Sequence, residues 1–89
     1  MGEVYGYGML TASGPVKAGP GLAHTVVLTA GADAASATLY DETTGSGDVI
    51  AVVKAAAGAT ESVLLDVAFG VGLYVVLAGT SPTMTVSYA

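Results

Sequence analysis

The residues of this chain that have acid–base chemistry are few and scattered. His24 is the single histidine, and it stands beside Thr25 at the start of an apolar segment. Glu61 and Asp66 are five positions apart on an expected strand, where side chains alternate, so they project to opposite faces. A general base needs a nucleophile or an orienting partner within hydrogen-bond reach, and the sequence marks none. We therefore expect a structural or interfacial His24, no catalytic residues and no enzyme.

A cluster of acids surrounds the Gly-rich segment DETTGSGD, which contains Asp41, Glu42 and Asp48. Carboxylates on a loop are ligands that Ca²⁺ uses, but the D-x-D-x-D-G spacing of an EF-hand is missing. One His and no Cys cannot supply a zinc centre. The Gly-x-Gly pairs at 6–8 and 70–72 lack the third Gly of a dinucleotide-binding loop. We interpret the acidic segment as a solvated hairpin loop and expect no metal and no cofactor.

Charge is scarce along the whole chain. Seven acids stand against two Lys and no Arg, which gives a net charge of −5. Nucleic acids and anionic lipids are bound through clustered cations, so we expect neither partner. The absence of Cys excludes a disulfide framework and thiolate chemistry.

Spacing and composition both predict β structure. The hydrophobic residues are dominated by Ala, Val and Leu, and the branched Val side chain favours a pleated surface. Short alternating segments are separated by Gly and polar turns at the spacing of a sandwich or barrel. The sequence predicts an all-β protein, either a small antiparallel β-sandwich or a jelly-roll-like barrel, with these strands: His24–Ala30, Ala35–Glu42, Asp48–Ala55, Thr60–Phe69, Leu73–Ala78 and Thr83–Tyr88.

Residues 1–21 are expected to form an irregular N-terminal arm that leads into a β-sandwich domain over 22–89. Pro15 and Pro20 each remove an amide donor and fix φ, which disfavours both a helix and a central strand. Tyr and Met are enriched at interfaces, so the arm is expected to contact a partner through a small set of side chains: Tyr5, Tyr7, Met9 and Leu10.

The stretch FGVGLYVVLAG at 69–79 is uninterrupted by charge. Thirteen apolar residues, from Val67 to Gly79, are too few to span a bilayer as a helix, which needs about 20. A strand covered on both faces also has a continuous apolar run. We expect a turn, FGVG, followed by a central strand, LYVVLA, and no membrane association. Two alternatives stay open for what packs on its other face, a second sheet or a neighbouring subunit.

A resemblance to a known group adds to this interpretation. The segments KAGPGLAHTVVLTAG, TLYDETTGSGDVIAVVKAAAG, VAFGVGLYVVLAG and MTVSYA resemble small virion proteins of tailed bacteriophages, over about residues 17–88. Their Leu-Tyr-Asp and Gly-Leu-Tyr-Val strands are structural motifs, so no catalytic residue comes with the resemblance. It implies a β-sandwich or jelly roll of the type found in head decoration, or cement, proteins, which commonly sit on the capsid as trimers.

The resemblance and the composition agree on a binding role. A chain of this size has a marginal core, and without disulfides the usual further support is other subunits. The expected function is a structural protein on the capsid exterior of the virion, which forms a homo-oligomer, by the resemblance a trimer, and binds major capsid subunits. A tail, neck or fibre component and a carbohydrate-binding β-sandwich module are the alternatives.

Overall fold

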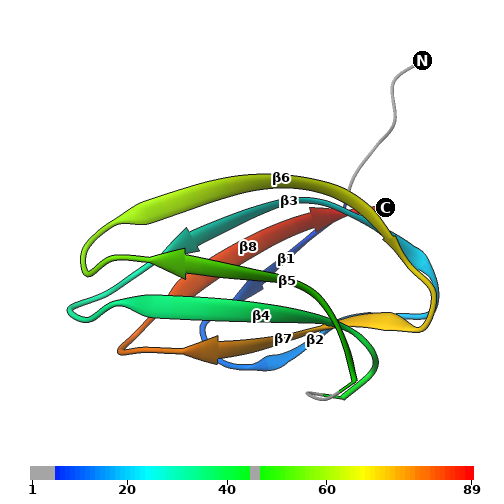
Figure 1. Ribbon diagram of the computed structural model, residues 1–89, viewed down its shortest axis with the longest axis horizontal. Coiled ribbons are helices and arrows are strands. Elements are labelled where there is room, and N and C mark those ends of the chain that lie inside the picture. Colours follow the sequence, from blue (N-terminus) through cyan, green and yellow to red (C-terminus); the bar gives the residue numbers. More distant parts are fainter. Residues whose placement is uncertain (1–5, 45–46) are drawn as a thin grey trace.

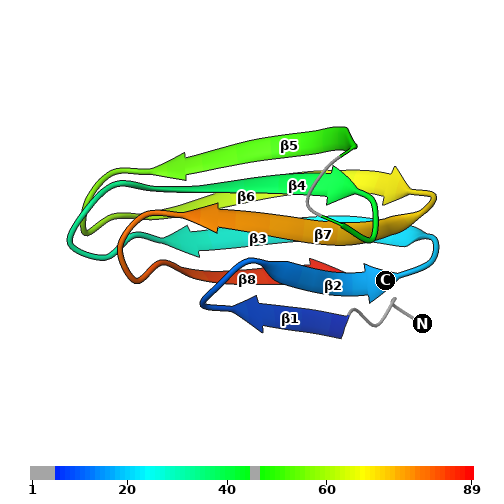
Figure 2. The same ribbon diagram turned by 90° about the horizontal axis from the view of Figure 1, so that it is seen from below.

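The computed structural model describes residues 6–44 and 47–89, which form two packed antiparallel sheets (Figure 1). One sheet has the strand order β1-β8-β3-β6, and the other has the order β2-β7-β4-β5. Figure 2 looks onto the second sheet, with the first behind it. The prediction of an all-β sandwich is confirmed, as two open sheets rather than a closed barrel. The strands are β1 (Gly6–Leu10), β2 (Gly14–Ala18), β3 (Gly21–Thr29), β4 (Ala35–Asp41), β5 (Asp48–Ala55), β6 (Thr60–Phe69), β7 (Gly72–Ala78) and β8 (Thr83–Tyr88).

The strand pairing is that of one long hairpin rolled up on itself. β1 pairs with β8, β2 with β7, β3 with β6 and β4 with β5, and every pair is antiparallel. Rolling this hairpin brings β3 against β8 and β4 against β7, which completes the two sheets. Eight strands in this order form a jelly roll, with sequence-distant strands as neighbours in both layers.

The expectation of an irregular arm is wrong for residues 6–18. These residues form β1 and β2, which are edge strands of the two different sheets. A proline is tolerated on an edge strand because its missing amide faces no ladder partner. Pro15 lies in β2 where the register with β7 shifts between Pro15 and Lys17. Composition alone disfavoured a strand here, whereas pairing with β7 and β8 stabilises one.

Most other strand bounds agree with the alternation of the sequence. β5, β6 and β8 have the expected bounds, whereas β3 begins earlier than expected, at Gly21. The continuous apolar segment becomes β7, which lies between β2 and β4 in the interior of its sheet. The expectation of a central strand in LYVVLA is therefore confirmed.

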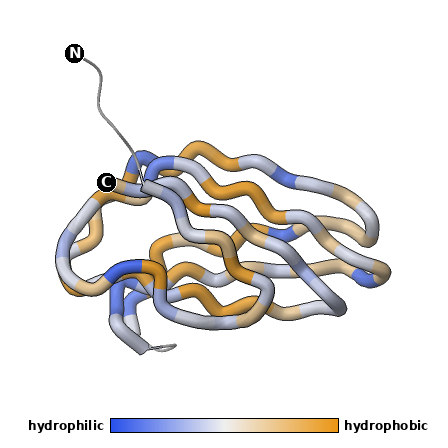
Figure 3. Tube along the Cα trace, turned by 180° about the vertical axis from the view of Figure 1, so that it is seen from behind, coloured by the Kyte–Doolittle hydropathy of each residue, from blue (hydrophilic) through white to orange (hydrophobic). Residues whose placement is uncertain are grey.

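The core lies between the sheets and is made of alternate positions of the inner strands. Hydrophobic positions run along the strands of both layers (Figure 3). An inward-facing side chain of this kind contributes about 1.5–3 kcal/mol on burial. The largest side chains that are fully buried are Val26, Leu28, Leu39, Leu73, Val75, Met84 and Val86.

Candidate functional site

The single histidine lies at a β-bulge on the outer face of the first sheet. The register of β3 shifts between Ala23 and Thr25 against both β6 and β8, and His24 is the residue between them. A bulge places two successive side chains on nearly the same side of a strand. Ala23 and Val26 are fully buried, whereas His24 and Thr25 are both partly exposed. The bulge thus places His24 outward together with Thr25.

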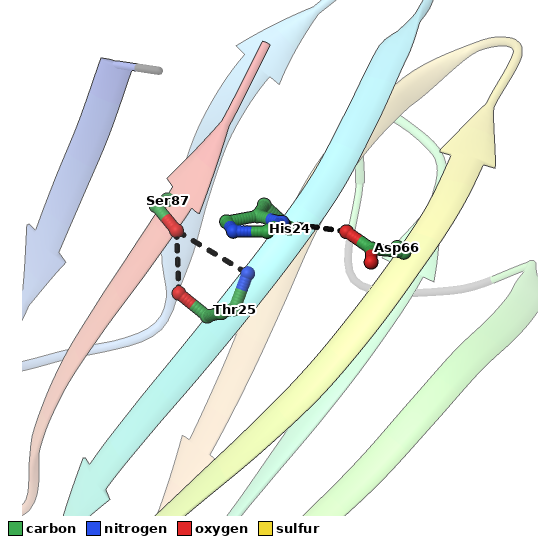
Figure 4. A network of polar contacts seen from close by, with 4 residues as sticks. All are labelled: His24, Thr25, Asp66 and Ser87. Atoms are coloured by element: carbon green, nitrogen blue, oxygen red, sulfur yellow. Dashed lines mark hydrogen bonds and ion pairs between the residues drawn. The ribbon is translucent and has the colours of Figure 1, made fainter. Parts of the chain in front are cut away.

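A carboxylate lies against this histidine, contrary to what the sequence marked. Asp66 Oδ1 is 2.5 Å from His24 Nδ1, across the β3–β6 pair (Figure 4). Asp66 has φ of 49°, a left-handed conformation that Asp tolerates better than most residues. The Asp66 side chain is 52% exposed, so this ion pair is a surface contact. Asp66 therefore orients His24 at the bulge, while its carboxylate stays on the solvated face.

A second polar pair lies beside the first. The Thr25 and Ser87 hydroxyl oxygens are 2.5 Å apart, and the Thr25 N–H donates to Ser87 Oγ at 3.2 Å (Figure 4). These contacts join β3 to β8 at the bulge. Ser, His and Asp side chains thus share one face, but the Ser87 hydroxyl bonds Thr25.

We call the outer side of β1, β8, β3 and β6 the hydroxyl face. Cross-strand partners share a face, so Tyr7, Ser87, Thr25 and Leu64 form one row and Met9, Thr85, Val27 and Ser62 the next. Of the expected partner-binding residues, Tyr7 and Met9 lie here and are 74% and 62% exposed. Leu10 is partly buried against the core instead. Tyr5 lies outside the described residues.

The acidic hairpin loop contains one carboxylate with a clear structural role. Asp41 ends β4, and its side chain accepts hydrogen bonds from the N–H groups of Gly70, Val71 and Gly72 at 2.8–3.3 Å. These donors form the FGVG turn between β6 and β7, so one carboxylate ties the two sheets together. The bonds from Gly70 and then Val71, with a further one from Gly72, lower the pKa of Asp41 against the opposing effect of burial.

The described residues contain no group of three acids or histidines that could hold a metal ion. The Asp41 carboxylate oxygens accept hydrogen bonds from backbone N–H groups. Glu42 and Asp48 are the other acidic residues of the loop. No helix in the described part of the chain is long and apolar enough to cross a bilayer.

We call the outer side of β2, β7, β4 and β5 the tyrosine face. Pro15, Tyr74, Tyr40 and Val49 are successive cross-strand partners, and they form a row across all four strands. Val76, Thr38 and Val52 form the next row. Val49 and Val52 are 54% and 53% exposed. This face is therefore an apolar and aromatic surface without charge in its two central rows.

Charges of opposite sign stand at the two ends of the tyrosine face. Lys54 is paired with Ser36 at the start of β4, and Glu42 directly follows the end of β4. Beside Lys54, small side chains leave an open hollow of about 420 Å³. The hollow is lined by Ala34, Ala35, Ser36, Lys54, Ala55, Ala56, Ala78 and Gly79.

The other lysine has contacts within its own chain. Lys17 Nζ donates to the Pro20 carbonyl at 2.7 Å and lies 5.9 Å from the centre of the Phe69 ring. Lys54, by contrast, is on an exposed position of β5. The two cations of the chain thus have different surroundings, and Lys54 is the one presented beside the tyrosine face.

The strand order of the two sheets is that of a jelly roll. No family model, no curated protein and no solved structure matches the chain. What the chain does is therefore argued from its own surfaces.

Sequence reasoning missed the features that only strand pairing creates. The alternation of Thr38, Tyr40 and Glu42 was visible, but not that Tyr40 and Tyr74 are neighbours across two strands. The His24–Asp66 contact joins positions 42 apart and depends on a bulge. A signal that pointed to it was the charge of Asp66 between the apolar residues Leu65 and Val67.

Proposed function

We propose that the protein is a structural component of a bacteriophage virion, a capsid decoration protein that associates with itself and binds major capsid subunits on the exterior of the head. The observation that carries this proposal is the apolar surface that a small sandwich exposes on both faces, with Tyr7, Met9 and Leu64 on one and Val49 and Val52 on the other. Exposed contiguous apolar surface is typical of interaction sites. The sequence resemblance is the reason for placing the protein in a virion, and the jelly roll is a fold that viral capsid domains use.

The polar clusters support a binding role rather than catalysis. His24, Asp66, Thr25 and Ser87 join adjacent strands on one face, and Asp41 holds a turn. These contacts are made between strands and turns of the protein itself. We therefore propose that the protein is not an enzyme and acts by burying surface against its partners. A homo-oligomer, with the trimer implied by the resemblance, remains part of this proposal.

Cryo-electron microscopy of phage particles that carry this protein tests the location. We expect density of one small β-sandwich per copy at regular positions on the outer capsid lattice. Density confined to the tail, neck or fibres contradicts the decoration role and supports the other virion location. A capsid lattice without this density, with the protein absent from the particle, contradicts both.

One observation favours a second candidate, a carbohydrate-binding module. Tyr40 and Tyr74 are adjacent on the tyrosine face, and exposed aromatic rings can stack on sugar rings. Lectin domains also use the jelly roll, so the fold admits this function. A glycan array with the purified chain separates the two. Selective glycan binding that is lost in Tyr74→Ala supports the carbohydrate module, and an array without hits contradicts it.

A further inference from the structure

We propose that the tyrosine face is the contact between two copies of this chain, packed face to face across a two-fold axis perpendicular to the strands. In this pair, Glu42 and Asp48 of each copy, at the end of β4 and the start of β5, lie against the hollow beside Lys54 of the other. The inference rests on the self-association in the proposed function and names the surface, the occupant and the symmetry. It does not depend on the virion location.

The apolar part of the contact consists of the two central rows of the face. The row from Pro15 to Val49 crosses the whole sheet, and the row with Val52 and Val76 lies beside it. Two sheets pack face to face at about 10 Å with interdigitating side chains, as the two layers within this sandwich do. A second copy offers an identical sheet with the same twist, so the same packing is available between the copies.

Charge identifies the occupant and the direction of its strands. Glu42 and Lys54 lie at opposite ends of neighbouring strands, about 20 Å apart at ~3.3 Å per residue. An axis perpendicular to the strands reverses their direction in the partner, which brings Lys54 near Glu42 of the second copy. An axis parallel to the strands would bring Lys54 opposite the β2 edge instead. In the first arrangement, Lys54 of each copy lies near Glu42 of the other, so opposite charges meet at two symmetry-related places. This matters in a chain whose net charge is −5.

Shape agrees with this direction. The end of β4 and the start of β5 bend away from the first sheet, towards the side of the tyrosine face (Figure 1). The hollow of about 420 Å³ lies at the other end of the same sheet. Reversal of the strands therefore brings Glu42 and Asp48 of each copy to the hollow of the other, which is lined by small side chains and Lys54.

The size of the face limits the strength of the contact between copies, and its two-fold symmetry sets the number of copies. Four strands of this length cover roughly 19 by 20 Å, which is less than the ~800 Å² per partner of a standard stable interface. We therefore expect a concentration-dependent pair in which the hairpin contacts are needed. Two-fold contacts give even numbers of copies: two, or six where three-fold contacts also form.

Sedimentation equilibrium of the full chain over a range of concentrations tests the contact. The wild type is expected to go from 8.6 kDa towards twice that mass or an even multiple. Val52→Lys, in the second apolar row of the face on the edge strand β5, is expected to abolish pairing. Leu64→Lys is the matched control because it puts the same charge at an exposed position of the hydroxyl face, 66% exposed against 53% for Val52.

A charge swap tests the direction of the strands. Glu42→Lys and Lys54→Glu are each expected to weaken pairing roughly tenfold, since each change places like charges together at both ends of the pair. The double variant restores opposite charges between the copies and is expected to pair nearly as the wild type. Glu61→Lys, on β6, makes the same charge change away from the face and is expected to leave pairing unchanged.

Four results would overturn the inference: a wild type that stays monomeric, one that forms only three copies, pairing that survives Val52→Lys, and single reversals that the swap does not rescue. Capsid binding distinguishes a failure of this contact from a failure of the proposed function. If Val52→Lys still decorates capsids and the wild type does not pair, the decoration role stands and this contact falls. If the wild type pairs as expected but binds no capsid, the contact stands and the decoration role falls.

Discussion

The hydroxyl face and the tyrosine face are the two outer sides of one sandwich, but their side chains make different contacts. On the hydroxyl face, Thr25 bonds Ser87 and His24 bonds Asp66, so polar side chains tie neighbouring strands together. On the tyrosine face, rings and branched chains stand in rows with Tyr40 and Tyr74 at the centre. Both faces expose apolar side chains, Tyr7, Met9 and Leu64 on the hydroxyl face and Val49 and Val52 on the tyrosine face. What distinguishes the hydroxyl face is the set of polar contacts that join its strands.

The largest expected effect separates the core from the tyrosine face within one strand. Val53 is 4% exposed and Val52 is 53% exposed, although they are neighbours in β5. Val53→Ala is expected to lower the free energy of unfolding by about 1.5–3 kcal/mol through lost burial and a cavity. Val52→Ala is expected to change it by less than about 0.5 kcal/mol. Urea unfolding at a concentration below pairing measures both.

An equal loss in the two variants would contradict the comparison. It would mean that Val52 belongs to the monomer's own core and that the tyrosine face is not available for a partner. Low protein concentration matters because any association would add stability by mass action.

The next effect tests the hydroxyl face. Thr25→Val removes a side chain that bonds Ser87 and leaves the partly buried Ser87 hydroxyl with one contact fewer, so we expect a loss of about 1–2 kcal/mol. Thr38→Val is the matched change on the tyrosine face, where a branched aliphatic side chain suits the row. We expect that change to be within about 0.5 kcal/mol. Equal effects on thermal or urea unfolding would erase the distinction between the faces.

A smaller effect belongs to the ion pair at the bulge. Asp66→Asn keeps a residue that tolerates the left-handed backbone of φ 49°, and so removes only the charge. A double-mutant cycle with His24→Gln is expected to give a coupling of about 0.2–1 kcal/mol, as for exposed pairs. The control is Asp66→Ala, which adds backbone strain and is expected to destabilise more than Asp66→Asn. A coupling well above this range would show that the pair is needed to hold the bulge.

The last effect is confined to acid pH and concerns the turn between the sheets. Because the pKa of Asp41 lies below its ordinary 3.8 in the folded chain, folding favours the ionised carboxylate. Its stabilisation is present above the unfolded pKa and is lost as pH falls through the folded pKa. Unfolding free energy measured from about pH 5 downward should therefore fall less steeply in Asp41→Asn than in the wild type. Identical slopes would contradict the role given to Asp41, and Asp33→Asn provides a control elsewhere.

Local pattern was sufficient for much of the fold but not for its surfaces. Alternation in Asp48–Ala55, Thr60–Phe69 and Thr83–Tyr88 marks strands because one face of each needs apolar contacts. The same rule failed for β1 and β2, where Gly and Pro weaken local preference and pairing with β8 and β7 decides. The four residues expected to bind a partner differ in their positions. Tyr7 and Met9 are exposed, Leu10 packs on the core, and Tyr5 lies outside the described residues.

By itself, the sequence determined that this chain is an all-β sandwich with few charges and that its apolar segment FGVGLYVVLAG contains a turn and a central strand. These properties follow from residue type and from spacing within a strand, which are local. Only the tertiary structure decided that Pro15, Tyr74, Tyr40 and Val49 form one row, that Asp66 reaches His24, and that Lys54 and Glu42 flank one face. Such neighbours depend on register between distant strands, and a shift of one residue would turn each side chain to the other face.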